Sequence, residues 1–155
     1  MNDKFYTGRG YELQRNNKGI LSPALEDYLE MIYRNSLKKP YIRINVLAQL
    51  LNVKDSSASK MVKRLGELNL VNYEKYGAVT LTDKGKEVGE YLLNRHNIIE
   101  SFLIFIGCSR DSLIQTELIE HVITEDAIKN IKVLYDFLNN DDKILRKYIE
   151  YRNTL

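Results

Sequence analysis

Residues 44–65 read INVLAQLLNVKDSSASKMVKRL, and this stretch decides the fold of the N-terminal half of the chain. Its apolar residues recur at helical spacing in two blocks joined by a tight connection, which predicts a helix-turn-helix. We expect Asp55 or Ser56 to cap the second helix, because their side-chain oxygens can accept hydrogen bonds from its first N–H groups. The apolar residues are Val46, Leu47, Leu50 and Leu51 in the first helix and, facing inward, Met61, Val62, Leu65 and Leu68 in the second.

The next segment, VNYEKYGAVTLT at residues 71–82, changes to a period of two, which is typical of β-strands. It predicts two short strands around a turn that contains Gly77. A helix, a tight connection, a second helix and a hairpin occur in this order in a winged helix-turn-helix. We therefore predict a mostly α-helical protein with a small β-hairpin wing, in which a winged helix-turn-helix precedes an α-helical dimerisation domain.

Capping residues mark where the other helices begin. Ser22 followed by Pro23 is typical of a helix start, and Thr82 and Thr124 are placed to cap two later helices. The expected helices outside the helix-turn-helix cover residues 22–38, about 84–106, 112–123, 124–138 and 143–153, the last after a break at 139–142.

Three segments follow from these elements. Residues 1–21 contain glycines and show no clean periodicity, so we expect an arm with weak intrinsic structure. Residues 22–83 are predicted to form the winged helix-turn-helix DNA-binding domain. Residues 84–155 are predicted to form a helical domain, and its run FLIFI and the helices after Thr124 are candidates for a twofold interface, because a monomer would expose them.

Composition restricts the class of protein. The chain has 155 residues, 44% of them hydrophobic, and a net charge of only +2, so contact with nucleic acid would need locally clustered basic residues. Neither its start, MNDKFYTGRG, nor its longest apolar run, FLIFIG at 102–107, resembles a secretory signal or a membrane span. The single cysteine, Cys108, cannot form an internal disulfide or pair in a thiolate metal site. We expect a cytoplasmic protein without a membrane partner.

The second helix of the helix-turn-helix carries the chemistry of a DNA-reading element. From Lys54 to Arg64, four basic residues stand against one acidic residue, a local excess suited to phosphate contact. Small hydroxyl side chains occupy its first turns, where a recognition helix enters the groove. A solvated helix with ordinary basic residues is the alternative, and the hairpin that follows at once favours DNA binding. The predicted DNA-binding residues are Ser56, Ser57, Ser59, Lys60, Lys63, Arg64 and, near the hairpin tip, Lys75 and Tyr76.

A second constellation lies in TELIEHVIT, residues 116–124. Glu117, Glu120 and His121 stand at i, i+3 and i+4, so a helix would point all three the same way, as metal ligands or as a solvated face. Asp27 and Glu30 share one side of the first helix, where a wet surface is the alternative. His96 lies among apolar residues on the expected buried face of the long helix, where a core histidine is the alternative.

The segments EDYLEMIY, INVLAQLLNVKDSSASKMVKRL, VNYEKYGAVTLTDKGKEVG, NRHNIIESFL and ELIEHVIT resemble, in order and spacing, the diphtheria-toxin-repressor family of metal-dependent repressors, specifically its manganese-sensing branch. The resemblance covers about residues 22–138. The iron-sensing branch has a methionine at the position of Asp27 and a cysteine at that of Glu117. The resemblance implies the metal ligands Asp27, Glu30, His96, Glu117, Glu120 and His121.

The resemblance also implies a cofactor and partners. Carboxylates at both branch-distinguishing positions favour Mn²⁺, although Fe²⁺, Co²⁺, Zn²⁺ or Cd²⁺ could bind the same set. Four carboxylates would repel one another, whereas two divalent cations per chain would balance their four negative charges. The implied protein is a homodimer in which metal fixes the DNA-reading heads for operator DNA, and a manganese sensor would most simply repress metal-uptake genes.

Two other classes of function remain open on the sequence alone. A binuclear hydrolase would need an open coordination position, a substrate cleft and a further base, and the only two histidines already belong to the predicted ligand set. A winged-helix regulator that ignores metal, or responds to a small organic ligand, would keep its DNA affinity when metal is removed.

Overall fold

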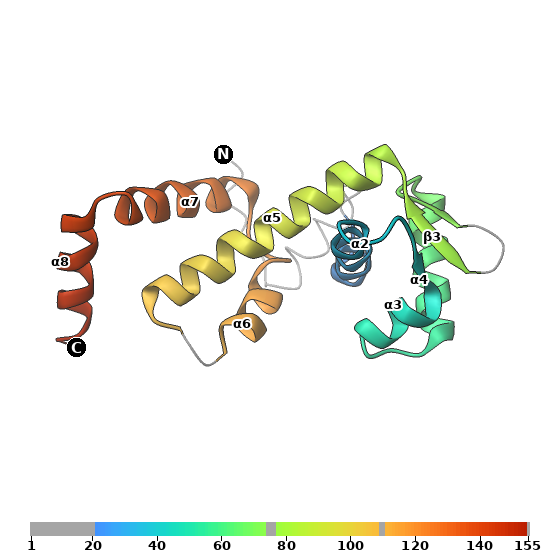
Figure 1. Ribbon diagram of the computed structural model, residues 1–155, viewed down its shortest axis with the longest axis horizontal. Helices are drawn as coiled ribbons and strands as arrows, with labels where there is room; N and C mark the ends of the chain where they lie inside the picture. Colours follow the sequence, from blue (N-terminus) through green and yellow to red (C-terminus); the bar gives the residue numbers. More distant parts are fainter. Residues whose placement is uncertain (1–20, 74–76, 109–110, 155) are drawn as a thin grey trace, which may run out of the picture. The chain divides into compact units, whose positions relative to one another are not determined.

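The computed structural model describes residues 21–73, 77–108 and 111–154 (Figure 1). It divides into two compact units, the first ending at Leu93 and the second beginning at Asn94, and each is described by itself. The long helix α5 (Asp83–Ile106) contributes to both. The predicted arm, apart from Leu21, and the predicted contacts Lys75 and Tyr76 lie outside the described residues.

The first unit is a winged helix-turn-helix, as the sequence predicts. Its helices are α2 (Pro23–Ser36), α3 (Ile44–Leu50) and α4 (Asp55–Glu67), and its strands are β1 (Ile42–Arg43), β2 (Val71–Tyr73) and β3 (Ala78–Leu81). The strands form one antiparallel sheet in the order β1-β3-β2. The predicted hairpin is confirmed by the pairing of β2 with β3, and Gly77 has a φ of 79° immediately before β3. The short strand β1 was not predicted, because two residues carry no readable period.

Helix capping in this unit agrees with the sequence at two of three places. The Ser22 hydroxyl accepts a hydrogen bond from the Leu25 N–H at 3.4 Å, and the Thr82 hydroxyl accepts one from the Gly85 N–H at 2.9 Å. The predicted cap of α4 is wrong, because Lys54 is the N-cap residue and makes no side-chain cap bond. Asp55 begins the helix instead, where its negative charge interacts favourably with the helix dipole.

The core of the first unit joins all its helices to the sheet. Leu29, Leu47, Leu65 and Val79 are fully buried. The inward-facing prediction for α4 fails at Leu68, which is 43% exposed because it follows the end of the helix as its C-cap residue. The whole core cluster comprises Leu25, Tyr28, Leu29, Ile32, Ile42, Ile44, Leu47, Ala48, Ala58, Val62, Leu65, Leu70, Val71, Val79 and Leu92.

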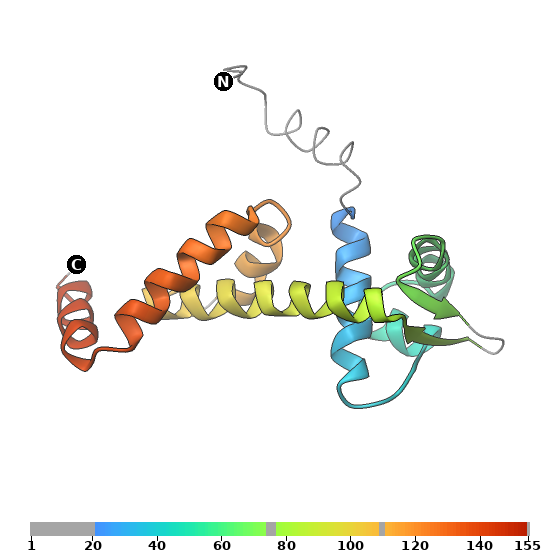
Figure 2. The same cartoon turned by 90° about the horizontal axis from the view of Figure 1, so that it is seen from above.

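Two glycines let α5 pack directly on this core. A Cβ atom on Gly85 would lie 1.8 Å from the carbonyl oxygen of Leu70, and one on Gly89 would lie 2.6 Å from the Cβ of Tyr33 in α2. Any larger residue would have to push backbone or side chain aside. Figure 2 shows the β-hairpin beside the N-terminal end of α5, where both glycines lie.

The second unit contains the end of α5 followed by α6 (Ser112–Ile119), α7 (Glu125–Asn139) and α8 (Asp142–Arg152). Thr124 caps α7 as predicted, and the predicted break at 139–142 is confirmed, with Asp141 capping α8. The helix predicted over 112–123 is shorter, because the chain leaves the helix after Ile119.

The apolar cluster in the described part of the second unit is small. Ile99, Leu103 and Ile128 are its buried members. Near the end of α5, the ring of Phe105 stacks on Tyr148 at 5.1 Å. The Arg152 guanidinium donates a hydrogen bond to the carbonyl oxygen of Phe105 at 2.8 Å, which ties α8 to α5.

Candidate metal centre and nucleic-acid interface

Helix α4 presents its predicted DNA-binding side chains on the surface. Ala58, Val62 and Leu65 are buried at helical spacing, which turns the opposite face of α4 away from the core. All six predicted residues on this helix are exposed, namely Ser56, Ser57, Ser59, Lys60, Lys63 and Arg64. Three cations and three hydroxyls on one exposed helix face can bind phosphates and the edges of bases.

The first two predicted metal ligands lie one turn apart on α2. Asp27 is partly buried, whereas Glu30 is only 6% exposed, so the wet-surface alternative does not describe Glu30. Burial raises the pKa of the neighbouring Tyr28 phenol, and the Asp27 carboxylate raises it further. Arg34 was not among the predicted site residues, but its Nε donates a hydrogen bond to Glu30 Oε1 at 2.8 Å. The i, i+4 spacing of the two residues is compatible with an ion pair but does not show that Glu30 is buried.

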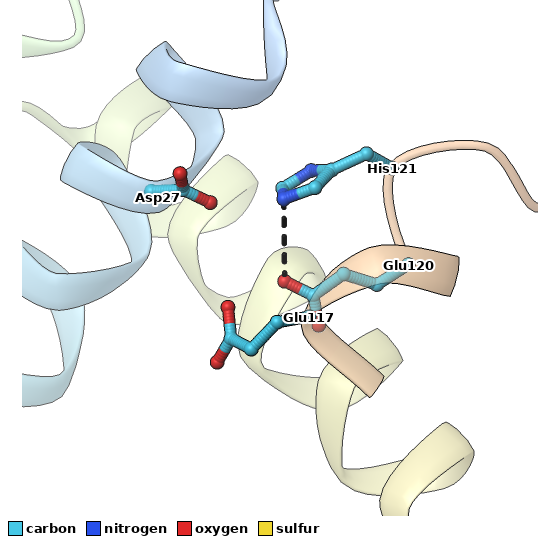
Figure 3. Close-up of side chains that lie close together, drawn as sticks. All are labelled: Asp27, Glu117, Glu120 and His121. Carbon is cyan, nitrogen blue, oxygen red and sulfur yellow. Dashed lines mark ion pairs between the residues drawn. The ribbon is translucent and has the colours of Figure 1, made fainter. Parts of the chain in front are cut away.

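The other four predicted ligands belong to the second unit, and the structure brings them together. His96 and Glu120 are each 1% exposed, and His96 Nδ1 lies 2.8 Å from Glu120 Oε2. Glu117 Oε1 lies 3.7 Å from the same Nδ1, and His121 Nε2 lies 3.8 Å from Glu120 Oε1. Figure 3 shows the side chains of Glu117, Glu120 and His121 with the ion pair between Glu120 and His121 dashed.

The end of α6 positions this cluster. Glu120 is the C-cap residue, with helical φ and ψ of −59° and −28°, and its N–H donates to the carbonyl oxygen of Thr116 at 2.9 Å. Glu117 and Glu120 therefore share a helix face, as predicted. His121 lies beyond the helix, in a turn, so the prediction of one continuous helix through it is wrong. Its ring nevertheless reaches the same group of ligand atoms.

The donor atoms of this cluster fit a metal ion. One ligand atom from each of Glu117, Glu120 and His121 lies within 4.8 Å of the others. Ligand atoms that share an ion at about 2.0–2.2 Å lie roughly 2.8 to 4.4 Å apart. The separations of 2.8, 3.7 and 3.8 Å around His96 and Glu120 are within that range. Oxygen and imidazole nitrogen donors without a thiolate suit Mn²⁺, Fe²⁺, Co²⁺ or Zn²⁺.

A further carboxylate lies beside His96. Glu100 Oε2 is 3.8 Å from His96 Nε2, one helical turn along α5, and its side chain is 34% exposed. The i, i+4 spacing of the two residues could have identified Glu100 from the sequence. A carboxylate on the far side of an imidazole attracts its ring N–H and helps to orient the ring.

Comparison with known proteins assigns the chain to a family. The model of the iron-dependent repressor N-terminal DNA-binding domain matches residues 20–79, and that of the iron-dependent repressor metal-binding and dimerisation domain matches residues 82–147. The chain belongs to the iron-dependent repressor family. It is accordingly a metal-responsive, DNA-binding transcriptional repressor with a dimerisation domain, and the hydrolase alternative is set aside.

Curated members of this family match most of the chain. The HTH-type transcriptional regulator MntR of Oceanobacillus iheyensis is 38% identical over 133 residues, which are 83% of this chain and 90% of that protein. MntR of Bacillus subtilis is 36% identical over 141 residues, 86% of this chain and 99% of that protein. The family assignment thus agrees with relatives that match nearly end to end.

Solved structures of the family share the fold. A manganese-dependent transcriptional repressor in complex with manganese is 28% identical with a TM-score of 0.66, and the match covers 73% of this chain and 53% of that one. The crystal structure of T. acidophilum IdeR is 26% identical with a TM-score of 0.64, and the match covers 75% of this chain and 55% of that one. The chain thus spans about half the length of these solved chains.

None of the helices in the described ranges is long and apolar enough to cross a membrane.

Proposed function

We propose that this repressor responds to Mn²⁺, which Asp27, Glu30, His96, Glu117, Glu120 and His121 would hold as a pair of ions. The observation that carries the proposal is the buried His96–Glu120 pair at 2.8 Å, which the carboxylate of Glu117 and the imidazole of His121 adjoin. Burying a carboxylate is unfavourable unless cations or hydrogen bonds compensate its charge, and a metal centre supplies such compensation.

The donor types support manganese over softer ions. Asp27 and Glu117 provide hard oxygen donors where a thioether or a thiolate would favour softer metals. The similarity to a manganese-dependent transcriptional repressor in complex with manganese supports the same ion. Bound Mn²⁺ supplies the positive charge that lets four carboxylates share one centre, and two ions per chain would balance them.

The distribution of the ligands suggests how metal controls DNA binding. Asp27 and Glu30 belong to α2 of the DNA-binding domain, whereas the other four ligands belong to the second unit. Ligation by both sets would restrict the freedom of each DNA-reading head in a homodimer, whose two recognition helices must match half-sites about one helical turn apart. Metal would thereby favour the DNA-competent members of the ensemble.

Linkage makes this mechanism reciprocal. Operator DNA should tighten metal binding by the factor by which metal tightens DNA binding.

We further propose that the regulated genes encode metal uptake, that α4 and the wing contact the operator, and that the protein acts in the cytoplasm. The domain boundary at residues 83 and 84 remains a prediction, since α5 continues across it.

An operator-binding assay with and without Mn²⁺ tests the proposal. The wild-type protein should bind its operator, selected from a random DNA library at saturating Mn²⁺, at least tenfold more tightly with metal than with chelator. Glu120→Ala should abolish this difference. Lys129→Gln, an exposed change on α7, is the matched control and should retain it. Metal-independent DNA affinity in the wild type would refute the proposal.

A further inference from the structure

Arg34 and Glu30 form an ion pair on α2 in which the two side chains differ in exposure and in the number of atoms that take part. Two guanidinium nitrogens of Arg34, Nε and Nη2, donate to the same carboxylate oxygen, Oε1 of Glu30. The side chain of Glu30 is 7% exposed and that of Arg34 is 36% exposed. The arginine therefore reaches inward from the surface to a buried carboxylate.

This geometry differs from the surface pairs elsewhere in the chain. Glu125 and Lys129 on α7 have the same i, i+4 order and lie 2.8 Å apart, but their side chains are 62% and 71% exposed. Such exposed pairs stabilise a helix only weakly, because water screens both charges. A buried carboxylate that accepts hydrogen bonds from two nitrogens of a planar guanidinium has much less freedom to rotate than a carboxylate in an exposed pair.

We propose that Arg34 is a positioning residue for the metal centre, which fixes the Glu30 carboxylate through Oε1 so that Oε2 is presented for coordination. This inference rests on the proposed function, because it takes Glu30 as a metal ligand. Metal-binding carboxylates are commonly held by such outer partners, and their loss costs about 10- to 100-fold in metal affinity.

Arg34 also carries a charge that opposes cation binding. Repulsion between the guanidinium and a divalent ion would weaken affinity, so the orienting effect and the repulsive effect have opposite signs. The partial exposure of Arg34 lets water screen its charge, whereas the two-donor grip on the buried Glu30 persists. The orienting effect is therefore the larger, and removing Arg34 weakens metal binding.

Two substitutions separate geometry from charge. Arg34→Gln removes both the charge and the two-donor grip, and should raise the Kd for Mn²⁺ about 10- to 100-fold. Arg34→Lys keeps the charge but offers a single ammonium group, so it should restore only part of the affinity. Lys129→Gln breaks the exposed pair with the same spacing and should leave the Kd unchanged.

The test is calorimetric titration of chelator-stripped full-length protein with Mn²⁺, with circular dichroism confirming that each variant is folded. Arg34→Gln should have little further effect in a Glu30→Gln background, because Arg34 acts through Glu30. Unchanged or tighter binding by Arg34→Gln, alongside saturable binding by the wild type, would overturn the role of Arg34 and leave the proposed function standing. No Mn²⁺ binding by the wild type would overturn both.

Discussion

The two units bury apolar side chains to very different extents. The first has a core that joins three helices and a sheet, with Leu29, Leu47 and Leu65 fully buried. The second has three buried members in its apolar cluster and leaves large apolar residues on its helices exposed, such as Leu118 at 70%, Val133 at 67% and Phe137 at 61%. The DNA-binding domain can therefore fold around its own core, whereas the second unit needs another surface to cover it, as a dimerisation domain does.

The core of the first unit offers the largest expected effect. Leu65→Ala should lower the free energy of unfolding by about 2–5 kcal/mol, because it leaves a cavity beneath α4. Urea denaturation followed by circular dichroism measures this change. The exposed Leu68→Ala in the same helix region is the control and should cost much less. Equal losses in the two variants would contradict the difference in burial between Leu65 and Leu68.

Substitutions on the exposed face of α7 should have an intermediate effect, and on dimerisation instead of on folding. Val133 and Phe137 lie one turn apart, and replacing both with serine should weaken dimerisation by about 2 kcal/mol or more, the cost of losing an interface hot spot. Sedimentation velocity over a range of concentrations detects the shift toward monomer. Lys129→Gln on the same helix should leave the dimer intact. An unchanged dimer in the serine variant would place the interface on another surface.

Removing helix caps should have the smallest effects on stability. The caps Thr82 in the first unit and Thr124 in the second allow the two units to be compared. Thr82 accepts a hydrogen bond from the Gly85 N–H at 2.9 Å and donates one to the carbonyl oxygen of Asn69 at 2.8 Å, whereas Thr124 accepts one from the Ala127 N–H at 3.3 Å. Thr82→Ala should cost about 1–2 kcal/mol and Thr124→Ala about 0.5–1 kcal/mol. Thermal unfolding of both variants measures the order, and a larger loss at Thr124 would contradict it.

The sequence predicted those features that repeat or that depend on local chemistry. Periodic apolar residues revealed the helix-turn-helix and the hairpin, and hydroxyl caps at Ser22, Thr82 and Thr124 marked three helix starts. Features set by tertiary context were missed. The strand β1 exists because it pairs with β3, and α6 ends at Ile119 although the apolar pattern continues.

The candidate metal site shows the same division. Spacing alone selected Glu117, Glu120 and His121, and the family resemblance joined them to His96 and to the two carboxylates of α2. The structure confirmed that His96 is buried, and added that Glu120 lies against it. Sequence spacing could not show that Arg34 binds a buried Glu30 carboxylate. An acidic and a basic residue at i and i+4 have the same sequence pattern whether the carboxylate is exposed or buried.

We propose that this chain binds a pair of Mn²⁺ ions through ligands from both of its units. Titration of chelator-stripped protein with Mn²⁺, followed by the loss of the free-ion paramagnetic signal, counts the ions directly. Saturation near two ions per chain, with both sites weakened by His121→Ala and by Asp27→Ala, is the predicted result. No saturable binding, or one weak site that neither substitution changes, would contradict this proposal.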